Sequence, residues 1–251
     1  MPTPFMHLNM AHKMISRPEL SPAATDLINQ HWPAFCLGNI AADFQQLCDI
    51  RRSTTHFYST PPDFGDHQAF DRMLAEYSAF AKPEMLTVDH AVFLAGYGAH
   101  LIYDLVWFHN IVRVFVYGEW GDKKSRFVAH NSLLAHEDHS SLKRLPERLG
   151  DVVSDIDPAG WLPFDPDDCL VTWQKLVADQ LMPGAEVQTL KIFSGRMGLT
   201  ADEFGARLTD PTWLQAEIFD HVPQTLISDV LETSISMSID QTQAYLEPIL
   251  S

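Results

Sequence analysis

Cysteine is scarce in this sequence, and its few cysteines follow no metal or redox spacing. Cys36, Cys48 and Cys169 are an odd number without a C-x-x-C pair. This pattern predicts free thiols rather than a disulfide framework. Free thiols in turn are typical of a protein from a reducing compartment.

Basic residues are also few. Lys and Arg number 17 against 33 Asp and Glu, which gives a net charge of -16 at pH 7. Because general affinity for nucleic acids comes from cations that neutralise phosphates, this balance argues against nucleic acid as a partner. It also argues against stable anchoring at an anionic membrane surface. A positive metal centre within an acidic protein can still bind a phosphate group.

Long hydrophobic runs are missing as well. No apolar stretch reaches the ~18 uncharged residues of a transmembrane helix, so none is expected. The N-terminal residues lack a basic segment followed by an apolar one. No signal peptide is therefore expected, and a cytoplasmic location is the default. The sequence also contains no internal repeat and no low-complexity tract.

What the chain does have is length and apolar content. Its 251 residues are 46% hydrophobic, which is enough for a sizeable core. Apolar residues recur at helical spacing along most of the chain. We expect an all-α, multi-helix bundle in a single domain 1–251. Its metal-site half, which holds most histidines, covers about 1–150, and a second helical half covers about 151–251.

Helix boundaries follow from caps and helix breakers. Ser21-Pro22, Thr87 and the capping box that begins at Thr200 each mark a helix start. The predicted helices cover residues 5–16, 22–31, 68–80, 88–109, 126–149, 169–182, 201 onward, 211–220 and 223–246, with loops at 59–66 and 151–168. Residues 111–118 are rich in β-branched side chains and fit a short strand or a helical continuation. Helix is favoured, because no partner strand is evident.

One apolar stretch, residues 94–109, organises the chain; it reads L-A-G-Y-G-A-H-L-I-Y-D-L-V-W-F-H. His100 and Asp104 lie one helical turn apart on the same face. Burying either group unpaired is costly. A divalent metal ion between them removes that cost, and so does a direct hydrogen bond within the core. This stretch alone leaves both readings open.

Other metal-binding residue types are spread over the same half of the chain. His7, Asp43 and His56 join His100 and Asp104 as potential nitrogen and oxygen ligands of zinc. In helical bundles such ligands commonly converge in the core from several helices. The alternative for each residue is a hydrogen-bonded polar group in the core.

Three ordered motifs within residues 1–110 resemble the zinc-dependent phospholipase C family, which is related in fold to the zinc-dependent single-strand nucleases. They are A-F-C-L-G-N-I-A-A-D-F, R-x-x-T-H-F-Y and G-Y-G-A-H-L-I-Y-D-L-V-W. The resemblance implies that Asp43, His56, His100 and Asp104 are zinc ligands, with Asp104 placed to bridge metals. It implies a further metal ligand at His7.

The chain departs from the family pattern at several points. Ala42 stands where the family usually has Pro, and the family's later His-x-x-x-Glu element is missing. Secreted members use a processed N-terminus as a ligand, which an unprocessed Met1 does not match. His109 follows Asp104 by five residues, about 140° around a regular helix, so it needs a break in the helix to join the site. His130 and His136, with Asp138, are the other candidate substitutes.

For each of the remaining candidate residues, an ordinary structural role is an alternative to a functional one. Arg52 near His56 can hold a phosphate through two hydrogen bonds or form a surface salt bridge. Trp107 lies on the same face of the predicted helix as His100, and it can line a pocket or pack in the core. We treat the other histidines as ordinary: His12, His31, His67, His90, His139 and His221.

These observations favour a metal-dependent hydrolase of phosphate esters. One to three zinc ions would activate water and clamp phosphate oxygens, and Asp43 is the candidate general base. The family-level substrate is a phospholipid headgroup linkage, but without a secretion signal or membrane helix a small soluble phosphoester fits better. The alternatives are a single-strand nuclease, a helical protein with one structural zinc, and a fold in which His100 and Asp104 pair without metal.

Overall fold

The computed structural model describes residues 1–59, 61–63 and 68–250, apart from the side chain of residue 167. Its regular structure in these ranges is helical, without strands, so the all-α prediction is confirmed. His67 and parts of the predicted 59–66 loop (residues 60 and 64–66) lie outside the described residues.

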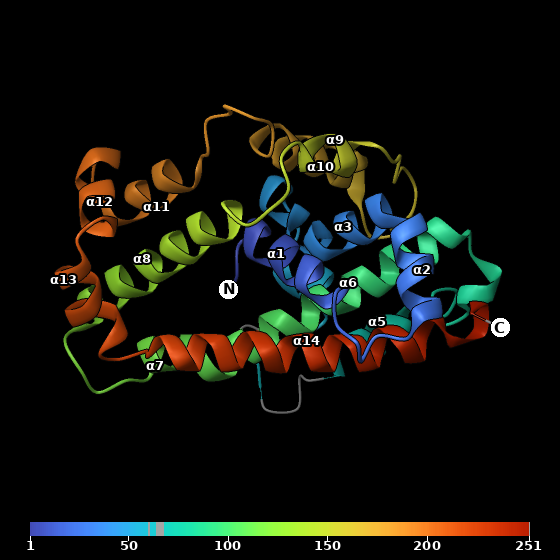
Figure 1. Ribbon diagram of the computed structural model, residues 1–251, viewed down its shortest axis with the longest axis horizontal. Helices are drawn as coiled ribbons and strands as arrows, with labels where there is room; N and C mark the ends of the chain where they lie inside the picture. Colours follow the sequence, from blue (N-terminus) through green and yellow to red (C-terminus); the bar gives the residue numbers. More distant parts are fainter. Residues whose placement is uncertain (60, 64–67, 251) are drawn as a thin grey trace.

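The elements follow one another along the chain as shown in Figure 1. They are α1 (Pro4–Met14), α2 (Pro22–Gln30), α3 (Trp32–Ala41), the 3-10 helix η1 (Ala42–Leu47), α4 (Arg52–His56), α5 (Ala69–Glu76), η3 (Pro83–Met85), α6 (Val88–Trp107), the π-helical turn η4 (Phe108–Val112), α7 (Arg113–Val116), α8 (Lys123–Leu142), α9 (Leu149–Ser154), η5 (Pro166–Asp168), α10 (Cys169–Gln180), α11 (Thr189–Met197), α12 (Ala201–Leu208), α13 (Pro211–Leu214), the π-helical turn η6 (Gln215–Phe219), α14 (Gln224–Leu246) and η7 (Glu247–Ile249).

Helix α6 forms the centre of the bundle, and every residue from Ala91 to Trp107 is buried. Helices α3 and α14 pack along it, and α14 crosses the front of the molecule in Figure 1. The segment Val88–Val116 is long and apolar enough to cross a membrane by length and composition, but 94% of its most apolar window is buried inside the protein. A core helix of a bundle has this character.

Two glycines allow α3 and α6 to touch through their backbones. A Cβ on Gly38 would lie 2.1 Å from the Phe93 carbonyl oxygen, and one on Gly96 would lie 2.5 Å from the Phe35 carbonyl oxygen. Any larger side chain would push the helices apart. This close approach brings the backbone of Asn39 within hydrogen-bonding reach of His100.

The predicted helix starts are confirmed. The side chains of Ser21 and Thr87 accept hydrogen bonds from the first turns of α2 and α6. Thr200 and Glu203 form the predicted capping box at α12. Residues 111–116 continue the central helix through η4 and α7 rather than forming a strand.

Several boundaries differ from the prediction, among them the end of the helix expected over 68–80, which stops at Glu76. The expected helix over 126–149 ends at Leu142, because Pro146 cannot donate a helical hydrogen bond and disfavours helix just before it. A new helix, α9, then occupies the start of the segment predicted as a loop. Helices α3, α4 and α11 had no counterpart in the prediction.

The prediction of free thiols is wrong for two of the three cysteines. Cys48 and Cys169 form a disulfide, although 121 residues separate them, while Cys36 is free and buried. The bond joins the end of η1 to the start of α10, two elements that pack together. Spacing along the chain cannot reveal such a pair. The reducing compartment inferred from free thiols therefore loses its basis.

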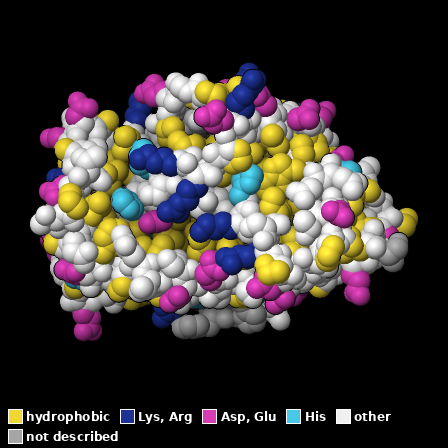
Figure 2. Space-filling view, viewed as in Figure 1, with side chains coloured by type: hydrophobic (Ala, Val, Ile, Leu, Met, Phe, Trp, Pro, Cys, Tyr) yellow, Lys and Arg dark blue, Asp and Glu magenta, His cyan; other side chains and the backbone are white. Residues whose placement is uncertain are grey.

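The surface charge is uneven despite the negative balance. Lys and Arg side chains form a row across the face that carries α1 and α8 (Figure 2), and hydrophobic side chains show between them. Burial and the charge of Arg144 lower the pKa of Lys13 below its ordinary value. Arg17 nearby forms an ion pair with Glu232 of α14.

Candidate metal centre

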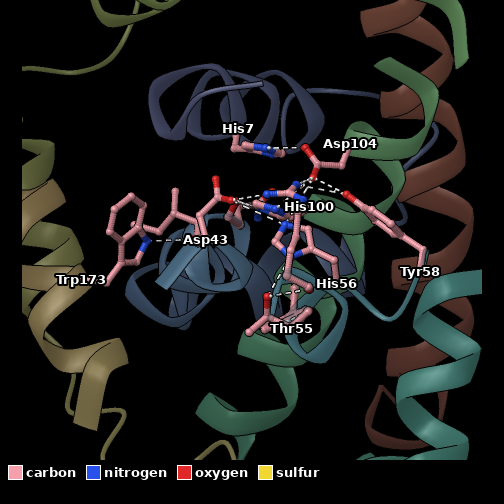
Figure 3. Close-up of polar contacts among 12 residues, drawn as sticks. His7, Asp43, Thr55, His56, Tyr58, His100, Asp104 and Trp173 are labelled. Carbon is pink, nitrogen blue, oxygen red and sulfur yellow. Dashed lines mark hydrogen bonds and ion pairs between the residues drawn. The ribbon is translucent and has the colours of Figure 1, made fainter. Parts of the chain in front are cut away.

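Five buried donor residues from four elements meet in the core beside α6 (Figure 3). His7 comes from α1, Asp43 from η1, His56 from α4, and His100 with Asp104 from α6. Each of the five is at most 3% exposed. The structure therefore brings together the residues singled out in the sequence.

The spacing of these donors suits a metal ion better than direct pairing. His56 Nε2 lies 3.5 Å from Asp43 Oδ1 and 3.4 Å from Asp104 Oδ2. His100 Nε2 lies 3.8 Å from Asp104 Oδ2, and His7 Nε2 lies 3.5 Å from Asp104 Oδ1. Charged hydrogen bonds are shorter, at about 2.7–2.9 Å. Two ligands that each bind a tetrahedral zinc at about 2.0–2.1 Å lie roughly 3.3–3.5 Å apart.

Several donor atoms in the cluster have no hydrogen-bond partner. They include Nε2 of His7, His56 and His100, and Oδ1 of Asp104. Leaving polar atoms buried and unpaired costs free energy. A metal ion would engage these atoms, so the residues present fit zinc.

Hydrogen bonds fix which ring nitrogen of each histidine is available. His100 Nδ1 lies 2.8 Å from the Asn39 carbonyl oxygen, which can only accept. The Thr55 hydroxyl donates to the Arg52 carbonyl oxygen and so accepts from His56 Nδ1, 2.8 Å away. Both rings therefore carry hydrogen on Nδ1 and turn a lone pair on Nε2 toward the centre. Such outer partners orient metal-binding histidines.

The electrostatics keep His100, Asp43 and Asp104 in the protonation states that metals bind. Burial, and next the charge of His7, lower the pKa of His100 to about 3. Burial alone would raise the pKa of Asp43 and Asp104. The neighbouring His56 and Arg52 together outweigh burial at Asp43, and the charge of Arg52 with the neighbouring histidines does so at Asp104, so both pKa values fall below their usual range.

Arg52 forms a buried ion-pair network with the two carboxylates. Its Nη1 donates to Asp43 Oδ1 at 3.2 Å, and its Nη2 donates to Asp104 Oδ2 and to the Tyr58 hydroxyl. Arg52 therefore forms a salt bridge, as considered, but with buried carboxylates of the donor cluster rather than at the surface. Tyr58 also donates to Asp104 Oδ2 at 2.7 Å. Tyr58 closes the R-x-x-T-H-F-Y motif but was not among the predicted site residues.

A cavity of about 880 Å³ adjoins the centre. Asp43, Arg52 and Tyr58 line it on the side of the donor cluster. Its other walls come mainly from apolar side chains of α1, η4, α8, α10 and α11, among them Phe5, Phe108, Leu134, Trp173 and Phe193. The donor cluster is thus connected to a space large enough for an organic ligand.

Comparison with known families identifies the chain. A model of the family described as zinc dependent phospholipase C matches residues 5–141, more than half of the 251 residues. The chain belongs to the zinc-dependent phospholipase C family. A comparison with curated proteins gave no match, and a comparison with solved structures gave none either. Family membership and the geometry of the donors together identify zinc as the metal that these groups can bind.

The candidate substitutes for the missing ligands of the zinc-dependent phospholipase C pattern lie outside the donor cluster. His109 sits in the π-helical turn η4, so the break that it needed is present, yet it joins neither group of metal donors. His130 packs against Phe115, and His136 packs against Phe219. Asp138 accepts hydrogen bonds from Thr3 and Thr189. Trp107 is fully buried in the core.

Proposed function

We propose that the chain is a zinc-dependent hydrolase of phosphate esters that bind in the 880 Å³ cavity. The observation that carries this proposal is the contact between the cavity and the donor cluster. Asp43 belongs to both, and Arg52, which lines the cavity, forms ion pairs with Asp43 and Asp104 of the cluster. A substrate in the cavity would place its phosphate beside the metal donors. A metal that only stabilises the fold has no need of such an opening.

The four donors nearest to one another have separate tasks in this proposal. His56 and His100 present Nε2 lone pairs, and Asp43 and Asp104 present carboxylate oxygens. Zinc, when bound, lowers the pKa of water and stabilises negative charge on phosphate oxygens. Asn39 and Thr55 hold the two rings in place from behind.

Asp43 was the predicted general base. Its carboxylate faces the cavity, so it can accept a proton from water there. Its pKa lies below the ordinary range, which makes it a weak proton acceptor. Metal ligation is the role that this environment favours, with proton transfer as a second one.

The cavity lining favours a phosphoester that carries an apolar group. Most of the wall is hydrophobic, and Leu47, Val116, Tyr117 and Ile192 line it while being 44–56% exposed. These exposed side chains would contact the apolar part of an amphiphilic substrate. A phospholipid-like diester therefore fits better than the small polar phosphoester expected from the sequence. The net charge of -16 still argues against nucleic acid polymers.

A structural zinc is the second candidate, and one observation favours it. Asp43, His56, His100 and Asp104 together offer four protein ligands, the number found in closed structural sites. A closed site would hold its metal against chelators and show no hydrolysis. A catalytic site must leave room for water or substrate.

The test compares the zinc-loaded protein with its His100→Ala variant on soluble short-chain phosphatidylcholine and on a single-stranded oligonucleotide. His139→Ala, at an exposed position on α8, is the matched control. We expect release of phosphocholine by the parent and the control, and a loss of about a hundredfold or more in His100→Ala. Zinc binding without any phosphoester hydrolysis would favour the structural alternative. Cleavage of the oligonucleotide alone would favour the nuclease alternative.

A further inference from the structure

The donor cluster contains two groups of three residues that share one member. His7, His100 and Asp104 form one group, and Asp43, His56 and His100 form the other. His100 offers only Nε2, because Nδ1 is bonded to the Asn39 carbonyl oxygen. One nitrogen lone pair binds one metal ion. The two groups can therefore not both be filled completely.

The group around Asp43 is the better provided of the two. Asp43, His56 and His100 offer three donors there, and Asp104 Oδ2 lies beside them, 3.4 Å from His56 Nε2. The other position would keep two side-chain donors, His7 Nε2 and Asp104 Oδ1, which lie 3.5 Å apart, and the buried α-amino group of Met1 lies close enough to interact with the Asp104 charge. Within the described residues, no further histidine or carboxylate joins either group. The geometry supports one firmly held ion.

Arg52 occupies the position of a second cation. It is the first residue of α4 and His56 is the last, so both project from the same short helix. Its guanidinium contacts Asp43 Oδ1 and Asp104 Oδ2, the two carboxylates that approach His56. Tyr58, which is 3% exposed, holds Nη2 in place at 3.1 Å. The arginine is therefore fixed within the centre.

The charge balance of the centre agrees with this count. Apart from the nearby α-amino group of Met1, whose pKa burial lowers to about 6, the two carboxylates and the guanidinium carry one net negative charge, which a single divalent ion converts into one net positive charge. A phosphodiester carries one negative charge and would neutralise it. Three divalent ions beside Arg52 would leave a large uncompensated positive charge in the core, which is unfavourable.

Arg52 also has N–H groups beyond those used in its three hydrogen bonds, and its side chain lines the cavity. A guanidinium has five N–H groups, and three hydrogen bonds to Asp43, Tyr58 and Asp104 are formed. Its side chain is 23% exposed and lines the cavity. Arginine suits phosphate because its planar group can donate two parallel hydrogen bonds to oxyanions.

We infer that the centre works with one metal ion, and that Arg52 replaces a second cation and binds the phosphate group of the ligand. This inference rests on the proposed function, since it assigns the phosphate subsite of the same centre. It applies to any phosphate monoester or diester that reaches the cavity.

The first measurement is zinc per chain by elemental analysis, after equilibration and removal of loosely bound metal. We expect one zinc in the parent. The second is calorimetric titration of the zinc-loaded protein with inorganic phosphate. Arg52→Gln should weaken phosphate binding tenfold or more while its zinc content stays at one per chain. Arg52→Lys, which keeps the charge but not the planar fork, should bind phosphate with intermediate affinity.

Arg148→Gln is the matched control, because Arg148 is an exposed arginine whose partner is Asp151. It should bind phosphate like the parent. Circular dichroism checks that each variant is folded. If Arg52→Gln does not fold, the zinc count of the parent and the Arg52→Lys titration still decide.

Two or three tightly held zinc ions in the parent would overturn the inference. So would unchanged phosphate affinity in Arg52→Gln with hydrolysis by the parent intact, a result that leaves the proposed function standing. A parent that binds no zinc would overturn the proposed function as well.

Discussion

Arg52 and His56 stand at the two ends of one short helix and reach the same carboxylate group. His56 Nε2 lies 3.4 Å from Asp104 Oδ2, and Arg52 forms an ion pair with that oxygen. Thr55 supports the arrangement from behind, through His56 Nδ1 and the Arg52 carbonyl oxygen. Helix α4 therefore carries the metal donor His56, the cation Arg52 and the residue Thr55 that holds both in place.

Thr55→Val should weaken zinc binding by about 10–100-fold without changing the fold, because it removes the acceptor that orients the His56 ring. Competition with a chromophoric chelator measures this affinity. Thr209→Val removes an exposed hydroxyl at the C-terminal cap of α12 and serves as the control, which should bind zinc like the parent. Equal affinity in both variants would show that His56 does not depend on Thr55, or is not a ligand.

Gly96→Ala should destabilise the protein by about 1–3 kcal/mol or more, because the new methyl group would meet the Phe35 carbonyl oxygen at 2.5 Å. Chemical unfolding measures the change. Gly195→Ala is the matched control, since nothing lies within 4 Å of a Cβ at this exposed helical position. That variant should gain about 0.5–1 kcal/mol. Equal effects of the two substitutions would contradict the close contact of α3 and α6.

The disulfide between Cys48 and Cys169 should contribute about 2–4 kcal/mol to the free energy of unfolding, because it closes a long loop in the unfolded chain. The parent should lose this amount in reductant. The double variant Cys48→Ser/Cys169→Ser should show the lower stability with or without reductant. Thiol titration of the unfolded, unreduced parent should find one free cysteine, and three would refute the bond.

Stability should depend on pH through Asp138, whose pKa burial raises to about 6. An unfolded aspartate has its ordinary pKa, so the folded form binds the proton more tightly. The contribution of Asp138 is then fully present below about pH 4 and is lost as pH rises through 6, a change of about 3 kcal/mol.

Asp138→Asn tests this sign. Asparagine stays neutral and can still accept from Thr3 and Thr189, so the variant should lack this part of the pH dependence. The free energy of unfolding should be measured for both proteins at pH 4 and pH 8. Relative to the parent, the variant should be more stable at pH 8 than at pH 4. A constant difference between the two proteins would contradict a raised pKa.

Local signals in the sequence predicted the capped helices well, but not α3, α4 and α11. Ser21, Thr87 and Thr200 form the expected caps because capping depends on residues three positions apart. The donor cluster was also predictable, since an ordered set of motifs carried His56, His100 and Asp104. Both the caps and the motifs depend on residues that are close together in the sequence.

Features that depend on distant contacts could not be predicted in this way. The Cys48–Cys169 bond requires α10 to pack on η1. The link from Arg52 to Asp104 likewise joins α4 to α6. At His109 the local prediction was met but the contact was not. The helix breaks in the π-helical turn η4, as ligation by His109 required, yet the ring joins neither group of metal donors. Tertiary packing determines such contacts, and the spacing of residues along the chain does not predict that packing.

The most direct test of the account is an anomalous diffraction measurement at the zinc edge on crystals of the zinc-loaded protein. We expect one strong peak about 2.0–2.2 Å from His56 Nε2 and His100 Nε2, with Asp43 and Asp104 as its oxygen neighbours. A peak among other residues, or none at these histidines in zinc-loaded crystals, would contradict the metal centre and the function built on it.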